Sequence, residues 1–333
     1  MVKIHELTIS PPLVNTSCAW ASDLPQLTEL YDCSYTGAVT TRTATLTGFQ
    51  EDSSNAVAFL KDSLSSLNSY GYSPHPLSAY VGWVKLLLER DPQSSKPFII
   101  SITDSFQESL YAMLASIQDL RKINPSWRSR IAVEFNASCP NIKGHPPPSY
   151  NFTSLLPILD VFAEQFWKDQ TLTIGLKLPP YVAATQFQEV VKGISTYSRH
   201  DPASGRSLNP FAFFTCTNTL GNSLVFAEVA VDGGVGSGQF AVPPALGGLA
   251  GEAIHSATYT QSEDPAVRGI IIIGAGGVTT PEAVARMHRA GAEVVGCATL
   301  LGRLGVAAFQ HLCGQSQNEV VKVTKDNFYS AKL

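Results

Sequence analysis

The sequence predicts an α/β fold in the form of a single (β/α)8 TIM barrel that spans residues 1–333. Short strand-like runs alternate with longer amphipathic segments along the whole chain, which is typical of a parallel sheet. The alternation contains eight strand-like runs, and eight such units in a chain of 333 residues favour a closed barrel over an open sheet. No linker-like tract interrupts this pattern, so we expect one domain.

The predicted strands are short runs rich in β-branched and aromatic residues, bounded by turn-forming residues. They are Leu13–Thr16, Ala38–Thr41, Phe98–Ile102, Ala132–Asn136, Thr173–Lys177, Ala212–Thr217, Ile270–Gly274 and Val294–Ala298. The predicted helices are segments in which apolar residues recur with helical spacing. They are Leu24–Tyr31, Leu77–Glu89, Phe106–Ile123, Phe152–Gln165, Ala183–Tyr197, Pro281–Ala290 and Val306–Leu312. We expect the remaining crossover, partly irregular, within Ser237–Ala257.

Three segments are too long to be simple connections between these elements. They are residues 43–78, 143–151 and 227–247, and each follows the carboxyl end of a predicted strand. Long loops in compact domains are usually functional, and in a barrel the loops after the strands build the active site. We therefore expect these three segments to cover the active site.

The composition argues against several classes of protein. Charged residues make up only 15% of the chain, against roughly 25% in average domains, which suits a protein with much buried surface, including a buried subunit interface. The net charge of −4 gives no electrostatic reason to expect nucleic acid. No apolar run approaches the roughly 18 residues of a membrane span, and the N-terminus lacks the apolar core of a signal peptide. The six cysteines form no CxxC pair, so we expect a cytoplasmic protein with free thiols and no metal.

Polar residues recur where the predicted strands end. They are Asn15, Ser17, Arg42, the run "NASCPN" at 136–141, Lys177, Asn218, Thr219, Asn222, "GAGG" at 274–277 and "CAT" at 297–299. Each alone has a structural explanation, since a cysteine at a strand end is more often a small buried hydrophobe and a glycine run is usually a turn. The carboxyl ends of barrel strands share one face, so the joint pattern predicts a ligand site there.

Two of these features carry more information. Lys177 lies in the apolar run "TIGLKLPP", where its charge requires a partner or a ligand. The glycine-rich turn and the strand end near residue 299 lie late in the barrel, where phosphate sites are common. Backbone N–H groups of Gly276, Gly277 and Thr299 are suited to cradle a phosphate.

The ordered motifs resemble those of the dihydroorotate dehydrogenases, most closely the soluble, fumarate-using class 1 branch. The motifs are "NASCPN", "GLKLPPY", "TNTLGN", "GGLAG" and "GAGGV", within a resemblance that runs from "NTS" at 15–17 to "GAEVVGCAT" at 291–299. The resemblance implies a barrel with FMN at the carboxyl face of its strands, usually a homodimer. It also implies the oxidation of dihydroorotate to orotate in pyrimidine biosynthesis, with a soluble electron acceptor.

The resemblance assigns the central roles to two residues. Cys139 matches the cysteine base that removes a proton from carbon 5 while the flavin takes hydride from carbon 6. A thiol can act so if its surroundings support the thiolate and exclude water. Lys177 matches a lysine at the pyrimidine edge of the flavin, where its charge stabilises the anionic reduced flavin.

The other implied site residues surround these two. The catalytic set is Cys139, Lys177 and Arg42. The substrate set, whose carboxamides suit an imide edge, is Asn68, Tyr70, Gly71, Tyr72, Asn136, Asn141, Asn218 and Thr219. The flavin set is Thr16, Ser17, Arg42, Asn136, Lys177, Thr219, Gly247, Gly248, Gly276, Gly277, Ala298 and Thr299.

The sequence departs from the branch where the orotate carboxylate is expected. Arg42 replaces a lysine, "NSYGYSPH" at 68–75 replaces "NSMGLPN", and "TGFQEDSSNA" at 47–56 replaces "GNPxPR". Arg42 can pair with a carboxylate in bidentate fashion, but Tyr70 and Tyr72 crowd the same corner. We therefore expect weak turnover of dihydroorotate. The alternative is a paralogous dehydrogenase or ene-reductase that acts on another small cyclic or conjugated carbonyl compound.

Two further classes differ from a flavin oxidoreductase. One is a hydrolase or transferase with Cys139 as nucleophile, which requires a base such as His145, the nearest histidine in sequence. The other is a catalytically inactive flavin- or ligand-binding barrel. The yellow colour of a bound flavin distinguishes an oxidoreductase from a hydrolase.

Overall fold

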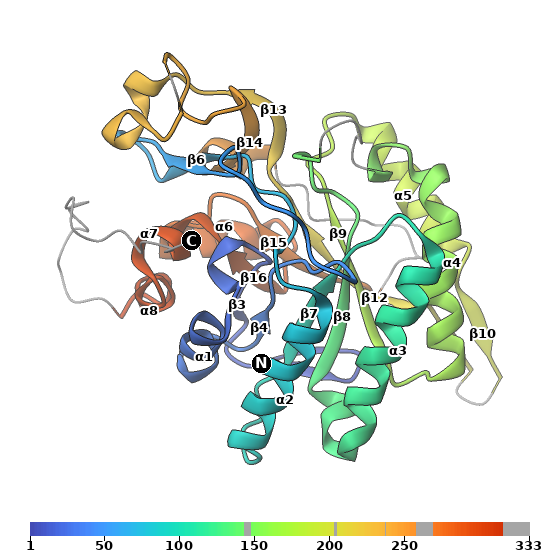
Figure 1. Cartoon of the computed structure of the whole chain (residues 1–333). Helices are drawn as coiled ribbons and strands as arrows, with labels where there is room; N and C mark the ends of the chain where they lie inside the picture. Colours follow the sequence, from blue (N-terminus) through green and yellow to red (C-terminus); the bar gives the residue numbers. More distant parts are fainter. Residues whose placement is uncertain (143–147, 203–204, 237, 258–268, 316–333) are drawn as a thin grey trace.

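The computed structural model of the chain describes residues 1–142, 148–202, 205–236, 238–257 and 269–315 (Figure 1). Its centre is a sheet of eight parallel strands. They are β3 (Leu13–Asn15), β4 (Val39–Thr40), β7 (Phe98–Ile102), β8 (Ile131–Asn136), β9 (Thr173–Leu178), β12 (Phe211–Cys216), β15 (Ile271–Ala275) and β16 (Val294–Cys297). All eight predicted strands are confirmed, and no predicted end is shifted by more than one residue.

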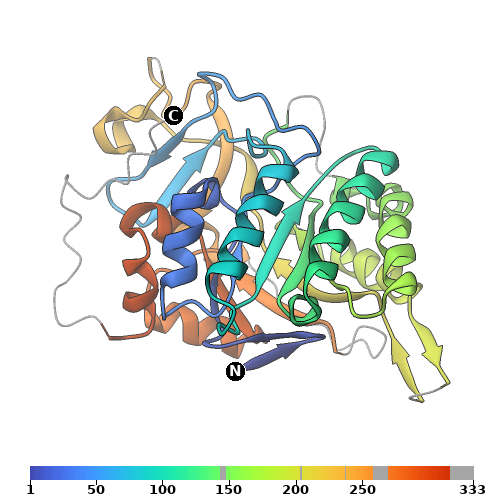
Figure 2. The same ribbon diagram turned by 60° about the horizontal axis from the view of Figure 1, so that its bottom comes forward.

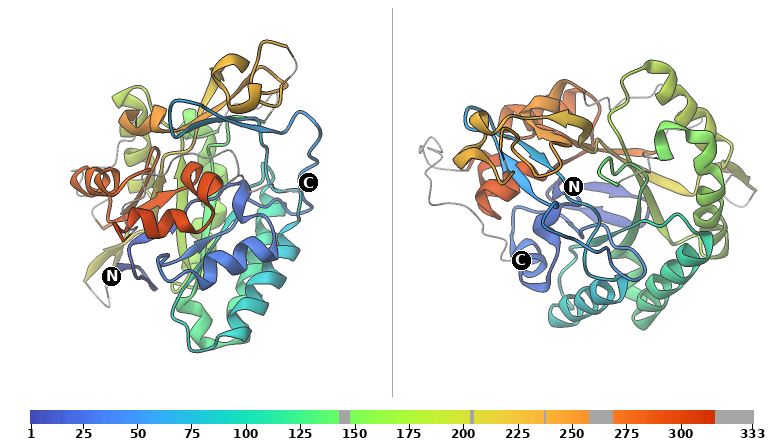
Figure 3. Two further views of the ribbon diagram at one scale, coloured as in Figure 1. Left: turned by 90° about the vertical axis from the view of Figure 1, so that its left-hand side faces the viewer. Right: turned by 45° about the horizontal axis from the view of Figure 1, so that its top comes forward.

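The eight strands curl into a nearly closed barrel. Their order is β3-β16-β15-β12-β9-β8-β7-β4, and a parallel bridge between Val14 and Ala38 joins the two ends. All carboxyl ends therefore meet on one face, which Figure 3 shows from above. The predicted (β/α)8 barrel is confirmed.

Helices surround the barrel, as their amphipathic sequences predict. They are α1 (Leu24–Asp32), α2 (Leu77–Arg90), α3 (Gln107–Ile123), α4 (Phe152–Lys168), α5 (Ala184–Ser195), α6 (Pro281–Arg289), α7 (Thr299–Leu304) and α8 (Ala307–Leu312). In α4 the buried residues Phe152, Leu155, Leu159, Phe162 and Phe166 recur every three or four positions and pack on the strands. Among the described residues, none of the helices combines the length and apolar character needed to cross a bilayer.

Two predictions about helices need correction. Helix α7 was not predicted, because five of its six residues are buried and its sequence therefore lacks the alternation of apolar and polar faces that marks a surface helix. The segment 237–257 contains no α-helix in its described part, but strand β14 (Leu246–Gly251) and the 3-10 helix η6 (Glu252–Ala257). The crossover between β12 and β15 continues through residues 258–268, which lie outside the described residues.

An N-terminal hairpin closes the amino end of the barrel (Figure 2). Strands β1 (Val2–Ile4) and β2 (Leu7–Ile9) pair antiparallel, and Ile4, Leu7 and Ile9 are buried. They pack in one cluster with inward-facing barrel residues. The hairpin plugs this end with apolar side chains, so ligand access is confined to the opposite, carboxyl face.

A four-stranded antiparallel sheet covers the carboxyl face (Figure 1). Its strands are β5 (Val57–Phe59), β6 (Ser65–Asn68), β13 (Leu220–Leu224) and β14. The segment 43–78, expected as a loop, thus supplies two strands. The segment 227–247 supplies the 3-10 helices η4 (Ala227–Val229) and η5 (Val231–Gly233). In the segment 143–151, residues 143–147 lie outside the described residues.

Candidate active site

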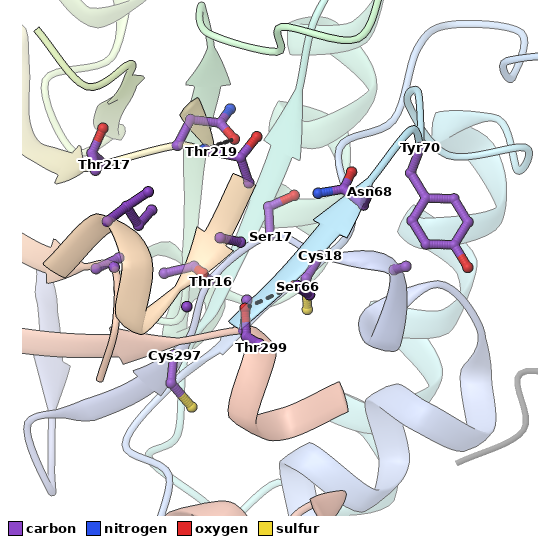
Figure 4. Close-up of a pocket in the computed structure, with 18 of the residues that line it drawn as sticks. Thr16, Ser17, Cys18, Ser66, Asn68, Tyr70, Thr217, Thr219, Cys297 and Thr299 are labelled. Atoms are coloured by element: carbon purple, nitrogen blue, oxygen red, sulfur yellow. Dashed lines mark hydrogen bonds between the residues drawn. The ribbon is translucent and has the colours of Figure 1, made fainter. Parts of the chain in front are cut away.

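A cavity lies between the carboxyl ends of the barrel strands and the covering sheet (Figure 4). It encloses about 1020 Å³ of empty space, including its open mouth. Residues at or just beyond the ends of β3, β4, β8, β9, β12, β15 and β16 form its floor, and β6 forms part of its roof. Parallel strand ends therefore bring residues that are distant in the sequence to one site.

The structure brings nearly all predicted site residues together around this cavity. Those that line it are Thr16, Ser17, Arg42, Asn68, Tyr70, Gly71, Tyr72, Asn136, Cys139, Asn141, Lys177, Asn218, Thr219, Gly276, Gly277, Ala298 and Thr299. Gly247 and Gly248 do not line it. His145, which the hydrolase interpretation required, lies outside the described residues.

Gly247 and Gly248 serve the close approach of β14 to its neighbours. A Cβ atom on Gly247 would lie 2.5 Å from the carbonyl oxygen of Asn68, and one on Gly248 would lie 2.2 Å from Oγ1 of Thr219. Both contacts are too short for a side chain, so glycine at 247 permits the close pairing of β14 with β6, and glycine at 248 leaves room for the side chain of Thr219. The last two residues of "GGLAG", Ala250 and Gly251, reach the cavity instead.

Several lining residues escaped the sequence analysis, among them Ser66, Cys18 and Thr217. Ser66 Oγ lies 3.4 Å from Thr299 Oγ1, the contact drawn in Figure 4. Ser66 and Asn68 are two residues apart on β6 and therefore point to the same side of the sheet. This alternation is the signal that could have found Ser66, but it was hidden because the segment was expected to be a loop.

A chain of hydroxyl groups runs beneath the cavity floor. Ser17 Oγ lies 2.8 Å from Thr43 Oγ1, and Thr43 Oγ1 lies 3.0 Å from Ser101 Oγ. Ser101 donates to Glu134 Oε1 at 2.9 Å, and Thr215 donates to the other oxygen of Glu134 at 2.6 Å. Because each hydroxyl has one proton, Ser101 must accept from Thr43, and Thr43 must accept from Ser17. Ser17 Oγ therefore presents lone pairs, and not a proton, to the cavity.

The carboxamide of Asn136 is held by the same network. Its Nδ2 donates to Thr43 Oγ1 at 2.9 Å, and its Oδ1 accepts from the backbone N–H of Ser138 at 3.1 Å. Asn218 Nδ2 donates to Ser138 Oγ at 2.9 Å. These bonds fix the orientation of both carboxamides before any ligand binds, which is the preorganisation that a binding site needs.

Lys177 brings a buried positive charge into the cavity. Its backbone pairs in register with Asn136 on β8 and with Thr215 on β12, so its side chain points from the barrel interior toward the mouth. Nζ donates to the backbone carbonyl of Ser17 at 2.9 Å, and only 5% of the residue is exposed. No carboxylate among the described residues lies within ion-pair distance of Nζ. The charge therefore remains available to an anionic ligand.

Cys139 lies shortly after the end of β8, half-buried in the cavity wall. Burial raises the pKa of its thiol, whereas the backbone N–H of Asn141 and the charges of Lys177 and Arg42 act in the opposite direction. The thiol is therefore protonated at neutral pH in the free protein. Use of Cys139 as a base depends on these three groups to support the thiolate.

Loop residues form one corner of the cavity roof, around Arg42, Tyr70 and Tyr72, and we call it the roof corner. Arg42 Nη2 donates to Glu51 Oε1 at 2.5 Å, and the guanidinium lies 5.2 Å from the centre of the Tyr70 ring. Asn141 Nδ2 donates to Asn68 Oδ1 at 3.0 Å and to the carbonyl of Tyr70 at 2.9 Å. These contacts join the segment after β8 to the segment after β6.

The turn after β15 has the features of a phosphate cradle. Gly276 and Gly277 have φ angles of 124° and 66°, a conformation that side chains rarely adopt. A Cβ atom on Gly277 would also lie 2.6 Å from the Cβ of His255. No group in the described part of the chain accepts the backbone N–H of either glycine. Two N–H groups that have no acceptor among the described residues, on a turn facing a cavity, are suited to bind phosphate oxygens.

Comparison with known proteins identifies the family of the chain. The family model described as dihydroorotate dehydrogenase matches residues 1–319. A probable dihydroorotate dehydrogenase A (fumarate) from Streptococcus pneumoniae serotype 4 is 28% identical over 313 residues, which cover 91% of this chain and 87% of the relative. A dihydroorotate dehydrogenase (fumarate) from Lachancea kluyveri is 28% identical over 314 residues, which cover 92% and 88%. The chain therefore belongs to the dihydroorotate dehydrogenase family.

Proposed function

We propose that the protein is an FMN-dependent dehydrogenase that oxidises dihydroorotate to orotate and passes the electrons to a soluble acceptor such as fumarate. The observation that carries the proposal is the convergence of three features on one cavity. These are the thiol of Cys139, the uncompensated charge of Lys177 and the glycine turn at Gly276–Gly277. The family match over residues 1–319 and the relatives named as fumarate-type enzymes support it.

The cavity residues fit FMN in both charge and shape. Gly276, Gly277 and Thr299 would bind the phosphate, and Lys177 would lie beside the ring system, where negative charge develops on reduction. The lone pairs of Ser17 call for an N–H donor on the ligand. When bound here, FMN supplies the acceptor for the hydride that leaves carbon 6 of the substrate.

Side chains of the cavity remove the proton from the substrate, bind its ring and support the thiolate. Cys139 Sγ takes the proton from carbon 5, and the electron pair of that C–H bond forms the new double bond to carbon 6. Asn68, Asn141 and Asn218 offer carboxamides to the imide edge of the ring. The buried Lys177 favours negative charge in the cavity and thereby also supports the thiolate.

The family assignment decides between most of the alternatives. The family consists of oxidoreductases that act on a CH–CH bond, so the hydrolase or transferase interpretation of Cys139 is wrong. The interpretation as a catalytically inactive barrel loses its support for the same reason. The match to relatives named for dihydroorotate also favours this substrate over another cyclic carbonyl compound.

We also propose a cytoplasmic homodimer. The low share of charged residues supports a subunit interface, as do exposed apolar side chains near the covering sheet. Leu224 is 43% exposed and Phe226 is 46% exposed. Light scattering of the purified protein after size exclusion should give twice the mass of the chain, and the mass of one chain would contradict the dimer.

The cofactor can be tested without any assay of activity. Acid release and chromatography of the ligand should yield FMN in a ratio of one per chain. Gly277→Ala should lose most of this FMN, because the new Cβ atom would collide with His255 and strain the backbone. Gly82→Ala, in a helix with open space around it, is the matched control and should retain FMN. A different cofactor, or full FMN retention in Gly277→Ala, would contradict the proposed site.

Turnover is tested separately with dihydroorotate and fumarate, by following the absorbance of orotate. The proposal expects formation of orotate that depends on both compounds or on a substitute soluble acceptor. A protein that holds FMN but forms no orotate with any acceptor would refute the substrate and leave the cofactor assignment intact.

A further inference from the structure

We infer that Glu51 is a positioning residue for substrate specificity: it holds Arg42 in an ion pair and so withholds that guanidinium from the anionic group of the substrate. The inference rests on the proposed function, because it concerns the carboxylate end of dihydroorotate. It assigns a role to a residue in the segment "TGFQEDSSNA", where the sequence differs from the branch that it resembles.

The ion pair is shielded from solvent on both sides. Arg42 Nη2 and Glu51 Oε1 are 2.5 Å apart, and the two side chains are 7% and 11% exposed. A pair this well shielded is screened much less than one on the surface. Arg42 lines the cavity, whereas Glu51 does not. Glu51 therefore acts from behind Arg42 and pulls its charge away from the ligand.

A count of donors shows how little of Arg42 remains for a ligand. A guanidinium has five N–H groups and can grip a carboxylate through either of two forks, both of which include Nη2. Here Nη2 donates to Glu51 and, at 3.4 Å, to the carbonyl of Gly71. Nη1 donates to Ser22 Oγ at 3.2 Å. With both protons of Nη2 engaged, neither fork is open, and Arg42 can offer an incoming carboxylate only single hydrogen bonds.

Neighbouring contacts keep Glu51 in this position. The ring of Phe49 packs on Gly71, where a Cβ atom would lie only 2.3 Å from Cε1 of Phe49. Phe49 also meets the ring of Tyr72 edge to face, with 5.9 Å between ring centres. Further along, Asn55 Nδ2 donates to the carbonyl of Ser69 at 2.9 Å. The segment that carries Glu51 is thus fastened at both ends to the segment that carries Tyr70 and Tyr72.

The ion pair between Arg42 and Glu51 lowers the positive charge that the cavity presents to a ligand. Among the described residues that line it, Arg42 and Lys177 are the charged ones, and both are cations. With Arg42 neutralised by Glu51, Lys177 remains as the source of uncompensated positive charge. The roof corner therefore selects a ligand by its shape and its neutral hydrogen-bonding edge more than by its carboxylate.

The substitution Glu51→Gln tests this inference on the protein with its bound cofactor. It keeps the size of the side chain but removes the charge, so Arg42 becomes free to bind a carboxylate. Isothermal titration with orotate should show binding that is about 10–100-fold tighter than in the parent, as expected for one charged hydrogen-bonding partner. Affinity for uracil, which has the same ring without the carboxylate, should not change. KM for dihydroorotate should fall by a similar factor, with kcat within about twofold.

Two controls separate this role from a structural one. Glu89→Gln removes the same charge from an exposed position on α2 and should leave orotate affinity unchanged. If Glu51→Gln does not fold, Glu51→Asp keeps the charge but shortens the side chain. This variant should loosen the pair and tighten orotate binding to a smaller degree.

Orotate affinity that is unchanged or weaker in Glu51→Gln, with folding intact, would overturn the inference, because Glu51 would then assist Arg42. Tighter binding of uracil to the same extent would overturn it as well. If the proposed function is wrong, a different result is expected: the parent protein will not turn over dihydroorotate. Orotate affinity still decides the role of Glu51 in that case, because binding is measured without catalysis.

Discussion

The floor and the roof corner of the cavity are held in different ways. On the floor, Lys177, Asn136 and Ser17 sit at the ends of barrel strands, and a buried network joins them to Glu134 in the barrel interior. At the roof corner, Arg42 follows β4 by a short connection and is held by Glu51, which lies on a long loop. Strand register fixes the first group, whereas loop packing fixes the second.

This difference suggests a division of roles, in which the floor carries the reaction and the roof corner sets the choice of substrate. The residues of the floor tolerate few substitutions, because the loss of one hydroxyl leaves its neighbours without hydrogen-bond partners. The corner can vary through its loops while the barrel stays intact. Several departures from the class 1 motifs lie at the corner, at Arg42, Tyr70, Tyr72 and the segment of Glu51, whereas "NASCPN" and "GLKLPPY" on the floor are kept.

The largest effect is expected from Cys139→Ser on the floor. A serine hydroxyl is a far weaker base than a thiol, so flavin reduction by substrate near neutral pH should slow by about 10²–10⁴-fold, with flavin still bound. Stopped-flow absorbance under anaerobic conditions measures this rate. Cys313→Ser, at an exposed position, is the control and should react like the parent. Equal rates in Cys139→Ser and the parent would show that Cys139 only packs against its neighbours and is not the base.

The pH dependence of the same reaction follows from the thiol. Burial raises the pKa of Cys139, so the thiolate fraction at neutral pH is small and increases as pH rises. The reduction rate should therefore climb through neutral pH and level off only above the ordinary pKa of a cysteine. A rate that is already level at pH 7 would show that Cys139 is not the base.

The next effect is expected at the corner. Arg42→Lys combined with Tyr70→Met and Tyr72→Leu restores the residues of the class 1 motifs and opens space at the carboxylate. Since a misplacement of about 1 Å can cost on the order of 100-fold in rate, dihydroorotate turnover should rise by up to that factor. Steady-state kinetics with fumarate measures the change. Turnover that stays equal or falls would show that the corner does not limit this substrate.

A smaller effect is expected from Lys177→Ala on the floor. Loss of a charged donor worth about 1.5–3 kcal/mol should lower the two-electron potential of the flavin by about 30–60 mV. Binding of FMN should weaken as well. Redox titration with reference dyes measures the potential, and equilibrium dialysis measures retention. An unchanged potential with full retention would remove Lys177 from the proposed role.

The smallest effect concerns the network beneath the floor. Thr43→Val keeps the shape of the side chain but removes the hydroxyl that joins Ser17, Ser101 and Asn136. The free energy of unfolding should fall by about 1–3 kcal/mol, measured by urea denaturation. Thr45→Val is the matched control, because the buried Oγ1 of Thr45 has no partner among the described residues. Equal stability in the two variants would show that the network does not hold the floor.

Most of the barrel could be predicted because its strands and helices leave strong local patterns. The strand of Lys177 is a short apolar run, and the apolar residues of α4 recur with helical spacing. Strands β5 and β6 have only weak local patterns because they are short, and the pair gains stability when β6 pairs with the distant β14. Long-range pairing of this kind cannot be recognised from the segment alone.

The same limit applies to the site. Cys139, Lys177 and Gly276 could be predicted because they lie at or just beyond the carboxyl ends of strands, where topology brings them together. The ion pair of Arg42 with Glu51 could not, because it depends on the path of a loop. Gly247 was misplaced for a related reason, since the sequence does not reveal that its small size serves strand pairing and not the cavity.

The most direct test of the account is to load the purified protein with oxidised FMN, mix it with dihydroorotate in the absence of oxygen and follow the flavin absorbance. If the floor carries the chemistry of this family, the flavin should bleach in a single turnover, and Cys139→Ser should abolish most of that rate. The constrained corner predicts that half-maximal bleaching requires less dihydroorotate in Glu51→Gln than in the parent. A flavin that stays oxidised at saturating dihydroorotate would contradict the proposed function.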